Sequence, residues 1–156
     1  MAELSAELRA ALEAEEAGEL NQLIQRRLAE DFAALRSLLS LDPSVSSDLR
    51  RKAMYALGRW GDTSVVPEIS RILPHLEEQG RISALSALGR LGTGEAVSKI
   101  LTFANDPSPQ VRKTVAVALG RAGTPEALAR LRDLAANDPL PWVREVAARQ
   151  ARVGAL

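Results

Sequence analysis

Few side chains in this chain of 156 residues have the chemistry of a catalytic or metal site. Cysteine is absent, which excludes disulfides, thiolate nucleophiles and cysteine-bound zinc. The one histidine, His75, follows Pro74 and has no serine or aspartate at the spacing of a catalytic motif. We therefore expect no catalytic residue, no metal site and no cofactor, and we expect that the protein is not an enzyme.

A glycine-rich segment, Gly92 to Glu95, comes nearest to an anion-binding motif. Backbone N–H groups at the start of a helix can bind an anion. The segment lacks the glycine order of a dinucleotide-binding loop, and it follows a helical pattern where such a loop needs a strand. Gly61 and Gly123 hold equivalent places, so a tight turn accounts for the segment.

Arginine is the residue type whose number and spacing predict a binding chemistry. It supplies 17 of the 20 basic residues, and its planar guanidinium group pairs with a carboxylate or phosphate through two parallel hydrogen bonds. The arginines include two regularly spaced series. The first series is Arg50, Arg81, Arg112 and Arg144, and the second is Arg59, Arg90, Arg121 and Arg152.

Both series follow an internal repeat of 31 residues. Residues 56–59, 87–90 and 118–121 each have the sequence Ala-Leu-Gly-Arg. Apolar residues downstream keep the same register, so that Val66, Val97 and Leu128 are equivalent. Self-similarity at a fixed period of this length is the signature of a repeat architecture.

Each period is expected to fold as two antiparallel helices. In residues 106–136 the apolar positions recur at steps of three and four residues, as on one face of a helix. Gly120 and Gly123 are expected to end the first helix, and Thr124 and Pro125 are typical of the start of the second. One such pair cannot bury its apolar face alone, so neighbouring pairs must stack. The sequence predicts an all-α fold, an α-solenoid of helix pairs.

Residues 42–156 resemble HEAT-like repeats of the phycobilisome-lyase type, as three helix pairs followed by a terminal capping helix. The resemblance lies in the segments from Asp106 to Arg112 and from Ala118 to Leu128. It implies that the first helix of each pair lines a concave surface. It also implies that an arginine after a valine pairs with a loop aspartate and ties successive repeats together. The residues of this implied ladder are Arg50, Arg81, Arg112, Arg144, Asp106 and Asp138.

The sequence departs from the family pattern in two units. The second unit has Gly80 where a valine is typical and His75 where an aspartate is typical. In the last unit the first arginine series is spaced by 32 residues and the second by 31. The register of that unit is therefore left open, as in a degenerate capping repeat.

Residues 1–41 are expected to form an acidic helical segment that caps the stack. They carry eight acidic residues against four arginines, a net charge of −4 that balances +4 on the remainder. Apolar spacing predicts one long amphipathic helix over Glu19–Ser40, a weaker helical stripe over Met1–Ala17, and a break at Gly18. A terminal helix that is docked on the stack or frayed is the favoured interpretation of the first stripe. A homodimer through these helices, or an arm that binds a partner, is the alternative.

The predicted concave face indicates a protein–protein interaction scaffold. Its stripe of basic residues contains few acids, which suits an acidic segment of another protein. A cation at the end of each first helix also complements the helix dipole, so stabilisation of the helix ends is the alternative explanation. The residues of this basic stripe are Arg51, Lys52, Tyr55, Arg59, Arg90, Lys113, Arg121, Arg149 and Arg152.

The family resemblance suggests two further functions. A bilin-lyase-like or other tetrapyrrole-handling protein would pair arginines with propionates, but only Tyr55 and two tryptophans are available to stack on the ring. Nucleic-acid binding is less favoured, because five aromatic residues in all hardly suit an aromatic-rich cleft.

The sequence also carries an expectation about location. Glutamates occupy the first residues where a secretory leader would be basic, and no segment approaches the ~20 apolar residues of a membrane helix. We expect a cytoplasmic protein that does not cross a membrane.

Overall fold

The computed structural model describes residues 3–154, and within that range it contains helices and no strand. Residues 1, 2, 155 and 156, at the outer ends of the two predicted segments, lie outside it. The predicted all-α solenoid is confirmed. The elements are α1 (Ala6–Glu13), α2 (Gly18–Arg26), α3 (Ala29–Ser37), α4 (Ser47–Trp60), η1 (Thr63–Val65), α5 (Val66–Ile72), η2 (Leu73–His75), α6 (Glu78–Leu91), α7 (Gly94–Leu101), α8 (Pro109–Ala122), α9 (Pro125–Asn137) and α10 (Pro141–Gly154).

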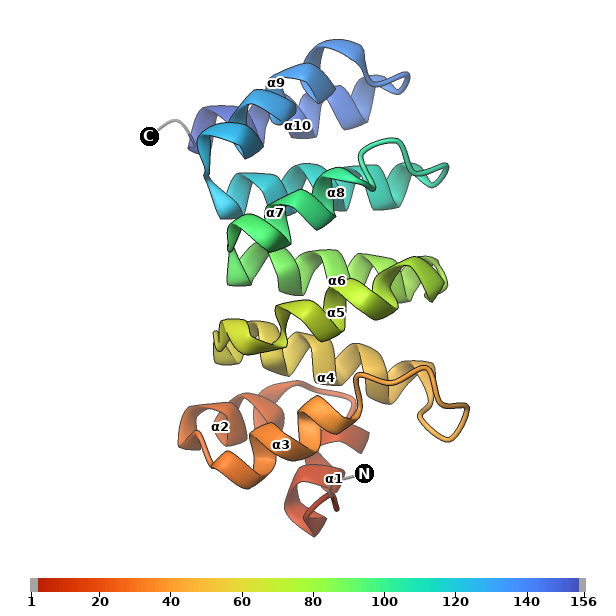
Figure 1. Cartoon of the computed structure of the whole chain (residues 1–156), viewed down its shortest axis with the longest axis vertical. Helices are drawn as coiled ribbons and strands as arrows, with labels where there is room; N and C mark the ends of the chain where they lie inside the picture. The colour runs from red at the N-terminus through yellow and green to blue at the C-terminus, as the bar shows by residue number, and fades with distance from the viewer. Residues whose placement is uncertain (1–2, 155–156) are drawn as a thin grey trace.

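The helices of the repeats form two layers (Figure 1). Helices α4, α6, α8 and α10 lie side by side and contact one another in chain order, and we call them the first-helix layer. Helices α5, α7 and α9 form the second-helix layer, and each contacts the first helix that follows it. A continuous apolar core lies between the layers and includes Met54, Leu85 and Val115. The stacked pairs therefore share one core, as a repeat protein requires.

The first helices end at glycines. Gly61, Gly92 and Gly123 have φ values of 80°, 65° and 64°, in the left-handed region that glycine adopts without strain. At the other end, the hydroxyl groups of Ser46 and Ser108 accept hydrogen bonds from the backbone of α4 and α8. Both ends of α4 and α8, and the C-terminal end of α6, are therefore set by residues of suitable local chemistry.

Glycines inside the first helices determine how closely these helices pack. A Cβ atom added at Gly58 would lie 3.0 Å from the Cα atom of Ala87 in the next first helix. One added at Gly89 would lie 2.6 Å from the Cα atom of Ala118. Any side chain at these positions would push the helices apart. Helices α4, α6 and α8 are therefore held in close backbone contact, whereas Gly120 of α8 faces the side chain of Gln150 in α10.

The last helix is offset by 32 residues, not 31. Arg112 in α8 and Arg144 in α10 donate hydrogen bonds to equivalent carbonyl groups of their preceding loops, which aligns the two helices at this spacing. The extra residue lies in α9. Arg152 is therefore equivalent to Gly120 and not to Arg121. Gly120, which was expected to help end its helix, lies inside α8 and faces α10.

The long helix expected over Glu19–Ser40 is wrong, because the segment folds as α2 and α3 with a sharp turn between them. Arg27 ends α2 with a positive φ of 53°. Its guanidinium group donates to the backbone oxygen of Trp60 at 2.9 Å and lies 5.5 Å from the centroid of the indole ring. Phe32 packs on the same indole, with ring centroids 5.4 Å apart. Contacts with the end of α4 thus override the helical periodicity.

The three N-terminal helices pack against α4 of their own chain. The break between α1 and α2 covers residues 14–17, directly before the predicted break at Gly18. Leu35 and Leu38 are buried as a cap requires, whereas Leu41, at the end of the predicted N-terminal segment, is 42% exposed. The homodimer through these helices stays a prediction.

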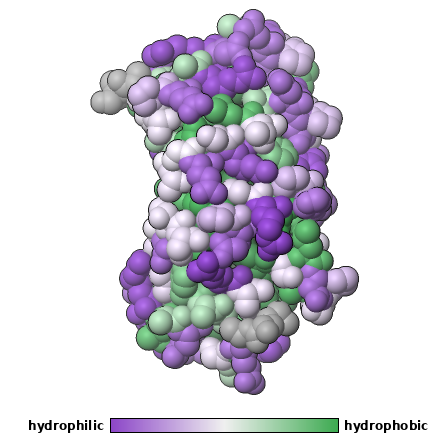
Figure 2. Space-filling model, viewed as in Figure 1, coloured by the Kyte–Doolittle hydropathy of each residue, from purple (hydrophilic) through white to green (hydrophobic). Residues whose placement is uncertain are grey.

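The side of the second-helix layer shows hydrophilic residues mixed with separate hydrophobic ones (Figure 2). The large apolar side chains that are exposed are few in the described part of the chain: Leu41 in a loop, Tyr55 on α4, and Trp142 and Val153 near opposite ends of α10. Within residues 3–154, no helix is both long enough and apolar enough to span a bilayer. The described surface therefore offers charged side chains, and no large apolar patch, for binding.

Candidate functional site

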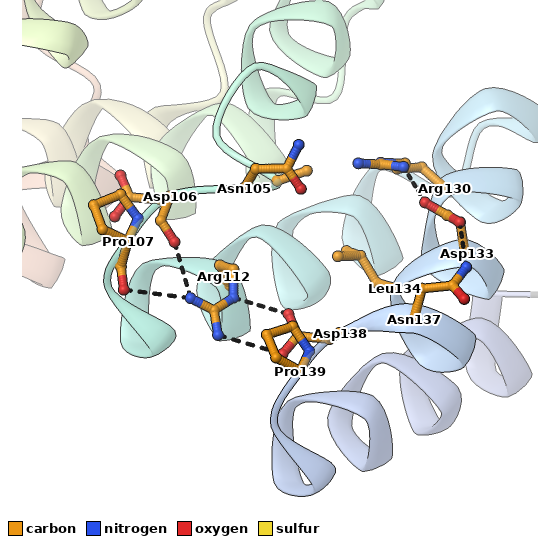
Figure 3. Close-up of a pocket in the computed structure, with 11 residues that line it drawn as sticks. Asn105, Asp106, Pro107, Arg112, Arg130, Asp133, Leu134, Asn137, Asp138 and Pro139 are labelled. Atoms are coloured by element: carbon orange, nitrogen blue, oxygen red, sulfur yellow. Dashed lines mark hydrogen bonds and ion pairs between the residues drawn. The ribbon is translucent and has the colours of Figure 1, made fainter.

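The first arginine series joins successive loops of the stack. Arg112 donates from Nε to Oδ2 of Asp138 at 2.8 Å and from Nη2 to Oδ1 at 3.3 Å. Its Nη1 atom also donates to the backbone oxygen of Asp106 at 2.9 Å (Figure 3). Both partners of the ion pair are buried. Such a pair is costly to break, because removal of one partner leaves the other charge buried and unmatched.

The other arginines of the first series make fewer contacts with aspartates than Arg112 does. Arg81 lies 3.1 Å from Asp106, measured from Nε to Oδ2. Arg50 has no such partner, since His75 holds the equivalent place, and it donates to two backbone oxygens at 2.6 and 3.0 Å. Arg144 likewise donates to backbone oxygens of the preceding loop. An ion pair thus forms where a loop aspartate follows one repeat later.

The electrostatics of Asp138 fit a structural role. Burial raises the pKa of its carboxyl group, but hydrogen bonds from Arg112 and from the backbone N–H of Leu140 outweigh this effect. The charges of Arg112 and Arg144 act in the same direction, and the pKa of Asp138 lies below its ordinary value. The carboxylate is ionised at neutral pH, and its charge is matched within the chain.

A cavity of about 280 Å³ lies beside this ladder. Its charged side chains already have partners in the chain. Asp133 pairs with Arg130 and accepts a hydrogen bond from the amide of Asn137 at 2.7 Å, as Figure 3 shows. The charges of this cavity are therefore satisfied without a ligand.

The second arginine series forms a different kind of site. Three of its members, in the last turns of α4, α6 and α8, line one pocket of about 450 Å³. We call this the arginine pocket. Three arginines and three glycines line it, namely Arg59, Arg90, Arg121, Gly58, Gly61 and Gly89.

The arginine pocket concentrates positive charge. Across residues 3–154, none of its three arginines takes part in an ion pair. Burial lowers the pKa of Arg90, and the charges of Arg121 and Arg59 lower it further. Like charges held this close repel one another, so an anion in the pocket would be stabilised by all three.

Tyr55 lies beside the arginine pocket and contacts one of its arginines. Its ring centroid lies 5.7 Å from the Cζ atom of Arg59, a cation–π contact. Its hydroxyl group donates to Oδ1 of Asn21 in α2 at 3.1 Å. A second cavity, of about 170 Å³, begins at Tyr55 and shares Arg90 with the pocket. The N-terminal helices therefore help to place one side of the site.

Two residues of the predicted basic stripe bind elements of their own chain. Arg51 and Lys52 pair with Asp48, at 3.0 and 3.3 Å. The Nζ atom of Lys52 also donates to the backbone oxygens of Leu12, at 2.6 Å, and Ala14, at 3.1 Å. Lys52 therefore caps the end of α1 and fastens the N-terminal segment to the stack.

The remaining stripe residues lie outside the arginine pocket. Arg149 pairs with Glu145 at 3.2 Å on the exposed side of α10. Lys113 is exposed on α8, and Arg152 is exposed at the position equivalent to Gly120. The structure thus brings three of the nine stripe residues together, places Tyr55 beside them, and puts the other five elsewhere.

Sequence reasoning misses two features of the site. Gly58 and Gly89 suit close helix packing, but their second role as the floor of the arginine pocket was not predicted. A glycine directly before an arginine in each repeat is the signal that could have found it. The capping of α1 by Lys52 has no signal in the periodicity, because it depends on the path of a non-repeating segment.

Two layers of stacked helix pairs, tied by an arginine–aspartate ladder between loops, define a helical repeat protein of the α-solenoid class. The family model for HEAT repeats matches residues 69–152, which is more than half of the chain. The chain belongs to the HEAT repeat family. The finer phycobilisome-lyase type stays a prediction. No curated protein matches the chain.

Proposed function

We propose that this protein is a non-enzymatic scaffold for protein–protein interaction, and that it holds an acidic segment of its partner in the arginine pocket. HEAT repeats generally mediate protein–protein interactions. One observation supports an acidic partner: Arg59, Arg90 and Arg121 line a single pocket. Within the described part of the chain, none of the three forms an ion pair.

The chemistry of guanidinium groups supports a carboxylate ligand. Each group offers two parallel N–H donors to one carboxylate, in a geometry that lysine does not match. The three arginines lie in the last turns of packed helices, so binding a ligand needs little reorganisation of the protein backbone. Binding also relieves the repulsion between Arg90 and its two neighbours. Association should be fast at low salt and weaken as salt screens these charges.

Removal of the pocket charges tests the proposal. The triple variant Arg59→Gln, Arg90→Gln, Arg121→Gln is expected to abolish binding of a fluorescent glutamate-rich peptide, measured by anisotropy. Circular dichroism should show that the variant remains folded, because changes at a surface site of this kind have small effects on stability. The same measurement on wild-type protein should show salt-dependent binding.

A matched control separates the pocket from net charge. The variant Arg71→Gln, Lys99→Gln, Arg132→Gln removes one cation from each second helix and loses the same total charge. It should bind the peptide as wild type does. Equal weakening in the two variants, or full binding by the pocket variant, contradicts the proposal. Pocket-dependent binding of single-stranded DNA without binding of the peptide would identify a nucleic-acid partner instead.

A further inference from the structure

The arginines of the pocket are spaced by the packing of the helices that carry them. Backbone contacts at Gly58 and Gly89 bring the first helices together, with added Cβ atoms 3.0 and 2.6 Å from the next Cα. With a Cα cylinder of radius about 2.3 Å, these contacts put successive helix axes about 9 Å apart or less. Each pocket arginine directly follows the glycine of its helix. Packed helix axes lie about 8–10 Å apart in general, so with this upper limit the Cα atoms of Arg59, Arg90 and Arg121 are expected to follow one another in steps of about 8–9 Å.

A bound segment must present its carboxylates at a matching interval. In a β-strand, side chains on one face recur about every 6.6–6.8 Å, which is too short, or about every 13 Å, which is too long. In an α-helix they recur about every 5.4 Å per turn or about 10.5 Å per two turns, and the two-turn repeat drifts sideways. A polyproline II helix has three residues per turn and a rise of about 3.1 Å, so its one-face interval is about 9.3 Å.

We infer that the arginine pocket takes an acidic partner segment in the polyproline II conformation, with a carboxylate at every third residue. This inference rests on the proposed function and specifies its ligand. Successive carboxylates would pair with Arg59, Arg90 and Arg121 along the stack. The segment would run across the first helices, from one repeat to the next.

The lining of the pocket suits such a slender ligand. Gly58, Gly61 and Gly89 place no side chains between the arginines, which leaves room for a peptide backbone. A polyproline II backbone makes no internal hydrogen bonds, so its carbonyl groups are free to accept. Each guanidinium group has five N–H donors, enough to bind a carboxylate and a neighbouring carbonyl group.

Peptides of one composition and different spacing test the inference. The first is Glu-Pro-Pro-Glu-Pro-Pro-Glu, and its permutation is Pro-Pro-Glu-Glu-Glu-Pro-Pro, which has equal charge and proline content. We expect the spaced peptide to bind wild-type protein about tenfold tighter, because only its three carboxylates can each meet a separate arginine. A serine–glutamate alternating peptide and an alanine-based helical peptide with glutamates two turns apart serve as strand and helix controls.

The outcomes distinguish this inference from the proposed function. Equal binding of the spaced and permuted peptides overturns the spacing but leaves an acidic ligand in the pocket. Tighter binding of the alternating or the helical peptide overturns the polyproline II conformation. If no acidic peptide binds wild-type protein, the inference and the proposed function both fail.

A register experiment gives a second readout. A peptide with two glutamates three residues apart can sit on Arg59 and Arg90, or on Arg90 and Arg121. Arg90→Gln should therefore weaken it more than Arg59→Gln or Arg121→Gln, each of which leaves one adjacent pair intact. Arg71→Gln in α5 is the control and should have no effect. Equal losses from the three pocket variants contradict the one-to-one pairing.

Discussion

The two arginine series share a period and a residue type, yet they lie in opposite surroundings. Arg112 is buried and reaches Asp138 at 2.8 Å. Arg90 lies in a pocket with two other arginines, and burial together with the charges of these neighbours lowers its pKa. The difference comes from what the next repeat supplies, which is an aspartate for Arg112 and another arginine for Arg90.

A sequence repeat therefore places the same contact between each pair of successive units. Where a side chain meets a complementary charge in the next unit, the period builds stability. Where it meets its own copy, the period builds a charged site that a ligand can neutralise.

The largest effect is expected on the ladder. Asp138→Ala leaves Arg112 buried without its carboxylate, so the free energy of unfolding should fall by about 3–5 kcal/mol in urea denaturation. Asp133→Ala removes a partly exposed ion pair with Arg130 and should cost about 1 kcal/mol or less. Similar losses in the two variants would show that burial does not distinguish the ladder from a surface pair.

The next largest effect on stability is expected at the close contact between Gly89 of α6 and Ala118 of α8. Gly89→Ala puts a methyl group 2.6 Å from the backbone of Ala118, and overpacking of this kind costs about 1–3 kcal/mol. Gly94→Ala has no neighbouring atom within 4 Å and serves as the control. The spacing of the pocket arginines should change together with stability, so acidic peptides should also bind Gly89→Ala more weakly. Unchanged stability would mean that the glycine contact does not set the spacing.

Two buried carboxylates should respond to pH with opposite signs. The pKa of Asp138 is lowered, so its contribution is present above the unfolded pKa of about 3.9 and is lost as pH falls through the folded value. Burial raises the pKa of Asp31, so its ionisation opposes folding and protonation relieves this. The deficit of Asp138→Asn relative to wild type should shrink on acidification. Asp31→Asn should be at least as stable as wild type at pH 7 and lose that advantage in acid.

The repeating part of this comparison could be predicted from the sequence. The 31-residue period identifies the helix pairs, and the family resemblance implies that the first arginine series pairs with Asp106 and Asp138. Which arginine meets which aspartate is seen only in the structure. The turn at Arg27 could not be predicted, because it depends on contacts with Trp60 on a later helix. The position of Arg152 relative to Arg121 could not be predicted either. One extra residue in α9 shifts the alignment of α10 without changing the local helical pattern.

The ladder lacks an aspartate at His75, and adding one should raise stability by a smaller amount. His75→Asp restores the family residue one repeat after Arg50, which now binds only backbone oxygens through its guanidinium group. A new partly exposed pair should raise the free energy of unfolding by up to about 1 kcal/mol. His75→Asn, which adds no charge, should give no such gain. A gain in both variants would trace the effect to the loss of histidine and not to a new pair.

The smallest effect on stability is expected in the second arginine series, whose pocket members form no ion pair within the described residues. Arg90→Gln removes a cation that faces Arg59 and Arg121, so stability should change by no more than about 0.5 kcal/mol in urea denaturation. Lost dipole stabilisation at the end of α6 is offset by relief of repulsion. The same substitution at Arg112 should cost several times more, because it leaves Asp138 buried without its guanidinium partner. If Arg90→Gln proved as damaging as Arg112→Gln, both series would be structural and the pocket would need no ligand.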